Sequence, residues 1–216
     1  PQLTGDETYK YLGMELRTGW ANGEGQTEMR KRCVADCKRV IWIIGNLPHL
    51  TGEQIRRNMA LALSGIIGYY GRSTAITWKD CQSIEQVRAG ALNAKGYSVG
   101  IPRLQIYDLK ERGGMGMEHA YTYAAAALID QVDRALSAVE GEPARVAVES
   151  SLAHTLRRLG CRSDNPLEWK PSWDWERELS DDLMIEAYLK AKWRCGVETV
   201  TTAGWEESEK GPLRSI

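Results

Sequence analysis

Hydrophobic positions recur at two different spacings along the chain. Near the N-terminus, "YKYLGMELRTGW" (residues 9–20) alternates apolar and polar side chains, which predicts one short strand of a β-hairpin and then a glycine-bearing turn. From about Thr27 the apolar spacing becomes helical, and Gly45 with Asn46 and Pro48 ends the run. The apolar positions of this first helix are Met29, Cys33, Cys37, Val40, Ile41 and Ile44.

The same helical spacing predicts five further helices. Thr51 followed by Gln54 is a capping-box signature and begins a helix that Gly71 ends. The others span about residues 78–94, 118–139, 144–159 and 179–194. We therefore predict a mainly α fold, a helical bundle with a short N-terminal β-hairpin.

Breaks in the pattern suggest the domain organisation. We predict a helical domain with its hairpin over residues 1–139, a C-terminal helical extension over 140–196 and a polar tail over 197–216. Residues 163–178 ("SDNPLEWKPSWDWERE") are expected to form an extended segment pinned by Trp169, Trp173 and Trp175.

Composition limits the class of protein. The chain is 43% hydrophobic and 26% charged, and it has no apolar run of about 18 residues, so no membrane insertion is expected. Five scattered cysteines favour reduced thiols and an intracellular, reducing compartment, namely nucleus, cytoplasm or organelle matrix. Because the chain begins at Pro1, we expect a processed product or an excised piece.

Charge is divided unevenly along the chain. Residues 1–116 hold 16 Lys and Arg against 11 Asp and Glu, a net +5, whereas residues 117–216 hold 12 against 18, a net −6. The candidate nucleic-acid-binding residues lie on the first two predicted helices: Arg30, Lys31, Arg32, Lys38, Arg39, Arg56 and Arg57. They form either an ordinary solvated face or a surface that follows a phosphate backbone.

Other reactive side chains favour structural interpretations. Asp181 and Asp182 could hold metal ions, but after Ser180 they read better as the cap and acidic first turn of a helix. Cys33 and Cys37 lie one turn apart on an apolar face and are expected in the core rather than on a metal. We predict no catalytic residue, no metal ligand and no cofactor; the histidines, His49, His119 and His154, are expected in a loop, at a helix start and on a helix surface.

The order of motifs resembles the thumb and post-thumb region of non-LTR (LINE-type) retrotransposon reverse transcriptases over about residues 7–139. Lys10, Tyr11, Leu12 and Gly13 match the "KYLG" strand that closes the palm of that family and leads into its thumb helices. Residues 113–116 ("GGMG") match its "GGLG"-type loop, with Met115 for the usual Leu. The resemblance implies a helical thumb that binds RNA or an RNA/DNA duplex.

The resemblance does not extend to the catalytic part of the family. The palm aspartates of the family lie upstream of the "KYLG" strand, and only eight residues precede Tyr9 here. We therefore expect a non-catalytic nucleic-acid-binding module. The alternatives are a repurposed structural subunit of a larger assembly, such as an organellar or ribonucleoprotein complex, and a reverse-transcriptase fragment whose palm lies on a missing segment.

Overall fold

The computed structural model describes six separate stretches of the chain. They are residues 8–11, 14–17, 24–95, 106–112, 114–160 and 177–197. The described part is mainly helical, which confirms the predicted fold class in its main feature. Its α-helices are α1 (Glu24–Asn46), α2 (Gly52–Gly71), α3 (Trp78–Ala94), α5 (Ala120–Leu136), α6 (Pro143–Arg158) and α8 (Met184–Cys195), with the short 3-10 helix η2 (Lys110–Arg112).

Two short strands precede the helices. Strand β1 (Thr8–Tyr11) pairs antiparallel with β2 (Met14–Arg17), so that Tyr9 lies opposite Leu16. The sequence predicted a single strand over this stretch, and the structure divides it between two strands. Residues 12 and 13, which complete the "KYLG" motif, lie outside the described residues, as does most of the predicted turn at 18–25.

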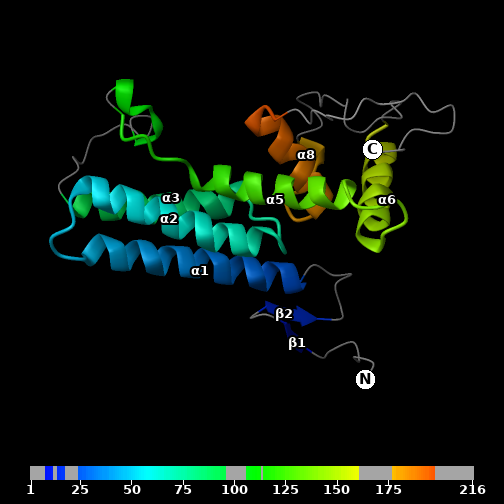
Figure 1. Cartoon of the computed structure of the whole chain (residues 1–216), viewed down its shortest axis with the longest axis horizontal. Helices are drawn as coiled ribbons and strands as arrows, with labels where there is room; N and C mark the ends of the chain where they lie inside the picture. The colour runs from blue at the N-terminus through cyan, green and yellow to red at the C-terminus, as the bar shows by residue number, and fades with distance from the viewer. Residues whose placement is uncertain are drawn as a thin grey trace. The chain divides into compact units, whose positions relative to one another are not determined.

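Helices α1, α2 and α3 lie side by side and share one core (Figure 1). Each helix contributes buried apolar side chains at a spacing of three, four or eight residues, which places them on one face. Removing such a side chain from water is worth about 1.5–3 kcal/mol, so this face stabilises the three-helix packing. The fully buried members include Ile41, Ile55, Met59, Leu63, Ile67, Ile84 and Leu92.

Local signals fix the helix ends that the sequence predicted best. The Thr51 side chain accepts a hydrogen bond from the Gln54 N–H, and the Gln54 side chain accepts one from the Thr51 N–H at 2.9 Å. Thr77 and Asp80 form a second capping box at the start of α3. Gly196, in the left-handed conformation at φ +61°, ends α8.

The chain divides into two compact units, residues 1–124 and 125–216, with the boundary inside α5. The sequence placed its division later, after residue 139, and the roles it gave to the two parts remain predictions. Helix α5 also ends earlier than predicted, at Leu136, and the chain then turns through Gly141 at φ +84°. Val139 is consequently 77% exposed rather than part of an apolar face.

The second unit contains the packed pair α6 and α8. Leu152 and Leu156 of α6 are buried, as are Tyr188 and Leu189 of α8. Tyr188 donates a hydrogen bond to the Asp133 carboxylate at 2.7 Å, which satisfies its buried hydroxyl. The tryptophan-rich segment predicted for residues 163–178 lies almost entirely outside the described residues, and so does the tail after residue 197.

The predicted cap of α8 is wrong. The helix begins at Met184, its N-cap is Leu183, and no side chain caps it. Asp181 instead pairs with the buried ammonium of Lys190 at 3.1 Å. The Ser180 N–H donates to the Glu186 carboxylate at 2.5 Å, so residues 180–183 form a turn held by side chains from within the helix.

Candidate nucleic-acid interface

Helix α1 carries the largest group of predicted binding residues. Its core-facing side is continuous, because Met29, Cys33, Cys37, Ile41 and Ile44 are all buried. An α-helix turns 100° per residue, so side chains two positions from members of this set lie on the opposite, solvent side, and the residues next to those lie on its flanks. The sequence of α1 therefore separates an apolar face from a polar outer face along its whole length.

Four cations occupy that outer face as two pairs seven residues apart. Lys31 and Arg32 form the first pair, and Lys38 and Arg39 form the second. Seven residues are two helical turns, so the pairs are separated by about 10 Å along the axis. This spacing gives the outer face of α1 a regular row of positive charge.

Acidic neighbours partly balance this row. The Lys31 ammonium lies 3.7 Å from the Glu28 carboxylate, and the Arg39 guanidinium lies 3.1 Å from Asp36. Both cations remain about 70% exposed, and exposed ion pairs contribute only about 0–1 kcal/mol. A phosphate could therefore replace either carboxylate at little cost.

Arg30 differs from its neighbours because it faces the protein. Its Nε lies 3.1 Å from the Asp80 carboxylate of α3, and its side chain is 21% exposed. Asp80 also closes the Thr77 capping box. Arg30 thus joins α1 to the start of α3, and this role accounts for its charge without a nucleic acid.

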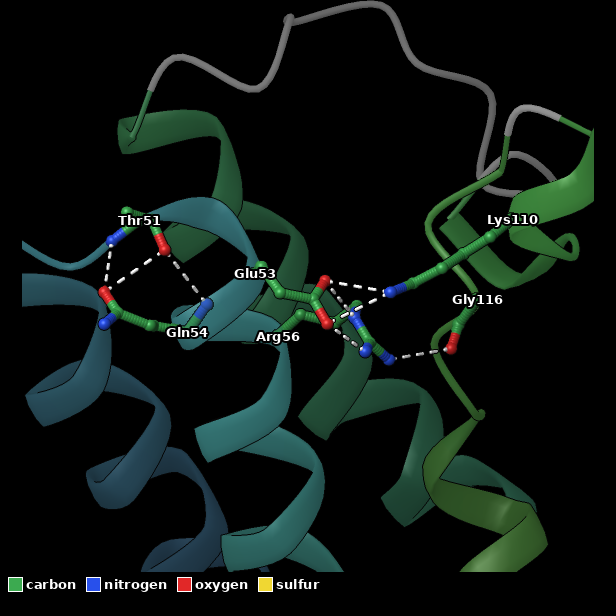
Figure 2. Close-up of polar contacts among 6 residues, drawn as sticks. All are labelled: Thr51, Glu53, Gln54, Arg56, Lys110 and Gly116. Atoms are coloured by element: carbon green, nitrogen blue, oxygen red, sulfur yellow. Dashed lines mark hydrogen bonds and ion pairs between the residues drawn. The ribbon is translucent and has the colours of Figure 1, made fainter.

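Arg56 and Arg57 are adjacent in sequence but occupy different environments. Arg57 is exposed on α2, whereas Arg56 is partly buried and fully engaged by protein groups. Figure 2 shows the Arg56 guanidinium between Glu53 and the backbone of Gly116, with Lys110 reaching Glu53 from the same loop. Arg56 Nη1 donates to the Gly116 carbonyl oxygen at 3.3 Å, and Lys110 Nζ contacts both Glu53 oxygens at 3.0 Å.

This cluster of Glu53, Arg56, Lys110 and Gly116, called here the loop clamp, changes the ionisation of its carboxylate. The pKa of Glu53 is lowered to about 2, first by the hydrogen bond from Arg56 and then by that from Lys110. The same contact with Glu53 raises the pKa of Arg56. Both groups therefore stay charged over the physiological range, and the clamp fastens the loop at residues 106–117 to α2.

The loop itself explains its glycines. A side chain at Gly114 would overlap the backbone of Asp108, and Gly116 adopts φ +59°, a left-handed conformation that favours glycine. The Gly116 N–H donates to the Asp108 carbonyl oxygen at 2.8 Å. The "GGMG" motif thus closes a compact turn in its described part, and Gly113 lies outside the described residues.

A buried network fastens the other side of this loop. Glu85 of α3 accepts hydrogen bonds from the Tyr107 hydroxyl and from the Ala120 N–H, both at 2.7 Å, and pairs with Arg88. Arg88 Nη2 donates to the Glu118 carbonyl oxygen at 2.8 Å. Burial, and then the hydrogen bond to Glu85, raises the pKa of Tyr107 to about 12.

The remaining candidates have structural roles. Cys33 and Cys37 are fully buried free thiols, as predicted, and a hydrogen bond with Cys37 together with burial raises the pKa of Cys33. His49 lies in a loop and His154 on an exposed helix face, whereas His119 stacks on Trp78 at the start of α5. Within the described ranges, no group of three or more His, Cys, Asp or Glu is placed to hold a metal ion.

The outer face of α1 also carries Trp42, which the sequence pattern did not single out. Trp42 is 66% exposed, and it follows Lys38 by four positions and Arg39 by three. That spacing places it on the same side of the helix as the two cations. The signal in the sequence is the helical spacing itself, because a tryptophan three or four positions from two cations shares their face.

Comparisons with known proteins identify no family for this chain. No family model matches the chain, and searches of curated proteins and of solved structures gave no significant match. Across the described residues, no helix combines the length and apolar character needed to cross a membrane.

Proposed function

We propose that the chain is a non-catalytic nucleic-acid-binding module related to the thumb of LINE-type reverse transcriptases. In this proposal, Lys31, Arg32, Lys38 and Arg39 of α1 contact the phosphates of RNA or of an RNA/DNA duplex, with a contribution from Arg57. Arg30 and Arg56 act indirectly, by holding α3 and the loop in place.

One observation carries the proposal: four cations lie on the outer face of one helix whose opposite face is buried core. Such a row contributes affinity that does not depend on base sequence and that falls with salt, because binding releases counterions from the nucleic acid. The excess positive charge of residues 1–116 supports the same interpretation.

The order of the elements supports the resemblance part of the proposal. Paired strands that include Lys10 and Tyr11 precede three packed helices, a glycine-closed loop and the alanine-rich α5. In the family, the corresponding hairpin leads from the palm into the thumb. We assign the hairpin here the same connecting role and no part in phosphate contact.

A charge-reversal pair tests the binding surface. The double variant Lys31→Glu/Arg39→Glu should weaken binding to a blunt RNA duplex at least tenfold at low salt. The slope of log affinity against log salt should also become shallower by about 2. Fluorescence anisotropy at several salt concentrations measures both quantities.

The chain offers a closely matched control. Arg112 and Arg134 are each 72% exposed and form ion pairs within their own segments, as Lys31 and Arg39 do at 70% and 71%. Arg112→Glu/Arg134→Glu changes the net charge equally and should retain most of the affinity. Equal losses in both variants, or no duplex binding by the wild type at low salt, would refute the proposed surface.

Absence of catalysis has its own test. Nucleotide addition requires carboxylates that hold two divalent ions, and Asp181 is instead paired with Lys190. The chain alone, supplied with Mg²⁺, nucleotides and a primed template, should give no primer extension. Extension that survives purification to homogeneity would overturn this part of the proposal.

A further inference from the structure

Trp42 occupies an unusual position for its residue type. Tryptophan is highly buried on average, yet Trp42 exposes 66% of its surface. Trp78, which is 41% exposed, has partners by contrast: it stacks on His119 at 4.8 Å and meets the edge of Tyr121 at 5.1 Å. The Trp42 ring therefore presents a large apolar surface to solvent on the outer face of α1.

The surroundings of Trp42 are cationic. Lys38 and Arg39 lie one turn before it on the same face, and Lys31 and Arg32 lie two turns before those. One turn after it, the Asn46 side chain donates to the Trp42 carbonyl oxygen at 2.7 Å, so that amide is directed to the backbone. The exposed ring is thus flanked by the positive row on one side.

A nucleotide matches both parts of this surface, the cations and the exposed ring. Its phosphate satisfies the cations and its base offers a flat π-surface to the indole, as in proteins that bind single strands by stacking. A base pair inside a duplex has both faces covered by its neighbours, so along the length of a strand only an unpaired base can stack on the ring. Charge complementarity therefore favours a nucleotide as the occupant, and the need for an open base face favours an unpaired one.

We propose that Trp42 stacks on an unpaired base of a single-stranded segment while Lys38 and Arg39 contact the adjacent phosphates. This inference rests on the proposed function and extends it, because it makes single-stranded RNA or DNA a ligand of the same face. Stacking of this kind increases affinity roughly five- to 150-fold per base.

Binding to two probes separates stacking from simple charge attraction. The probes are an oligouridylate of about 16 nucleotides and a blunt RNA duplex of the same length. Trp42→Ala should weaken oligouridylate binding about tenfold and leave duplex binding within about twofold. Trp42→Tyr, which keeps an aromatic ring, should recover most of the loss.

A matched control and a folding check accompany these variants. Leu61 of α2 is 64% exposed, so Leu61→Ala removes a comparably exposed apolar side chain and should change neither affinity. Circular dichroism and the urea midpoint establish that each variant folds. A third probe, vesicles of phosphatidylserine and phosphatidylcholine, detects the alternative that the ring enters a membrane surface.

Each outcome bears on one of the two proposals. Three results for Trp42→Ala would each overturn the stacking proposal. They are an unchanged affinity for oligouridylate, an equal loss of affinity for both RNA probes, and a loss of affinity for vesicles alone. The phosphate-binding proposal stands in those cases if Lys31→Glu/Arg39→Glu still loses the duplex. If the wild type binds neither RNA at low salt, both proposals fail.

Discussion

The guanidinium of Arg56 donates a hydrogen bond to the carbonyl oxygen of Gly116, 60 positions further along the chain. This contact joins the N-terminal part of α2 to the glycine that closes the loop. It also gives Arg56 a role that its neighbour Arg57 does not share, although the two look alike in the sequence.

Arg56→Ala and Arg57→Ala should therefore differ in kind. Arg56→Ala should lower the free energy of unfolding by about 1–3 kcal/mol. The Gly116 carbonyl oxygen loses its charged donor, and Glu53 loses one of its partners. Arg57→Ala should change stability by less than about 0.5 kcal/mol. Urea unfolding followed by circular dichroism measures both.

Binding should show the opposite order. Arg57→Ala should reduce the salt slope for RNA duplex by about 1, whereas Arg56→Ala should leave the slope unchanged. A wild-type stability for Arg56→Ala would show that the contact with Gly116 contributes nothing to the fold.

Local signals explain why much of the helical fold was predictable. The start of α3 follows from Thr77 and Asp80, and the start of α2 follows from Thr51 and Gln54, because each capping box is complete within four residues. The apolar spacing then fixes which face is buried. Such information lies within a single turn of the chain.

Contacts between distant segments explain the rest. No residue near Arg56 in the sequence indicates its contact with Gly116, so the sequence predicted a surface cation at this position. Asp181 carried the local signature of a helix cap, but its pairing with Lys190 prevailed and the helix began later. Separating internal from outward cations on α1 likewise required knowing that Asp80 would lie beside Arg30.

The loop clamp should make stability depend on acid. The folded pKa of Glu53 is about 2, below its ordinary value of 4.5. A lowered carboxylate pKa contributes stability above the unfolded pKa, and this contribution is lost as pH falls towards the folded value. The gap in urea midpoint between wild type and Glu53→Gln should thus be constant above about pH 5 and close towards pH 2.

A second acidic residue serves as the control for that titration. Glu111 lies exposed in η2, close in sequence to Lys110. Glu111→Gln should follow the wild-type curve across the acid range. A gap for Glu53→Gln that stays open down to pH 2 would contradict the assigned role of the carboxylate.

Glu85→Ala should be among the most damaging single changes in the described chain. It leaves Arg88, which is 1% exposed, without its carboxylate, and it removes the acceptor of the Tyr107 hydroxyl and of the Ala120 N–H. Breaking a buried pair in this way costs about 3–5 kcal/mol. Thermal and urea unfolding measure the loss.

An exposed ion pair gives the comparison for Glu85. Asp130 pairs with Arg134 at 2.8 Å, but the two side chains are 44% and 72% exposed. Asp130→Ala should therefore cost less than about 1 kcal/mol. Similar losses in the two variants would mean that the buried Glu85 network does not fasten the loop as proposed.

Thiol labelling should report the packing of α1 and α3 directly. Cys33, Cys37 and Cys81 are fully buried and burial helps to raise the pKa of Cys33 and Cys81, whereas Cys195 is exposed at the end of α8. Only the thiolate reacts, so iodoacetamide should label Cys195 at least about tenfold faster than these three thiols in native protein. Partial burial also raises the pKa of Cys195, so its labelling rate should increase as pH rises from about 7 to 9.

Peptide mass spectrometry follows the labelling of each site. In denaturant all four of these thiols should react alike. Labelling of Cys33 in native protein at the rate of Cys195 would mean that α1 does not pack as described.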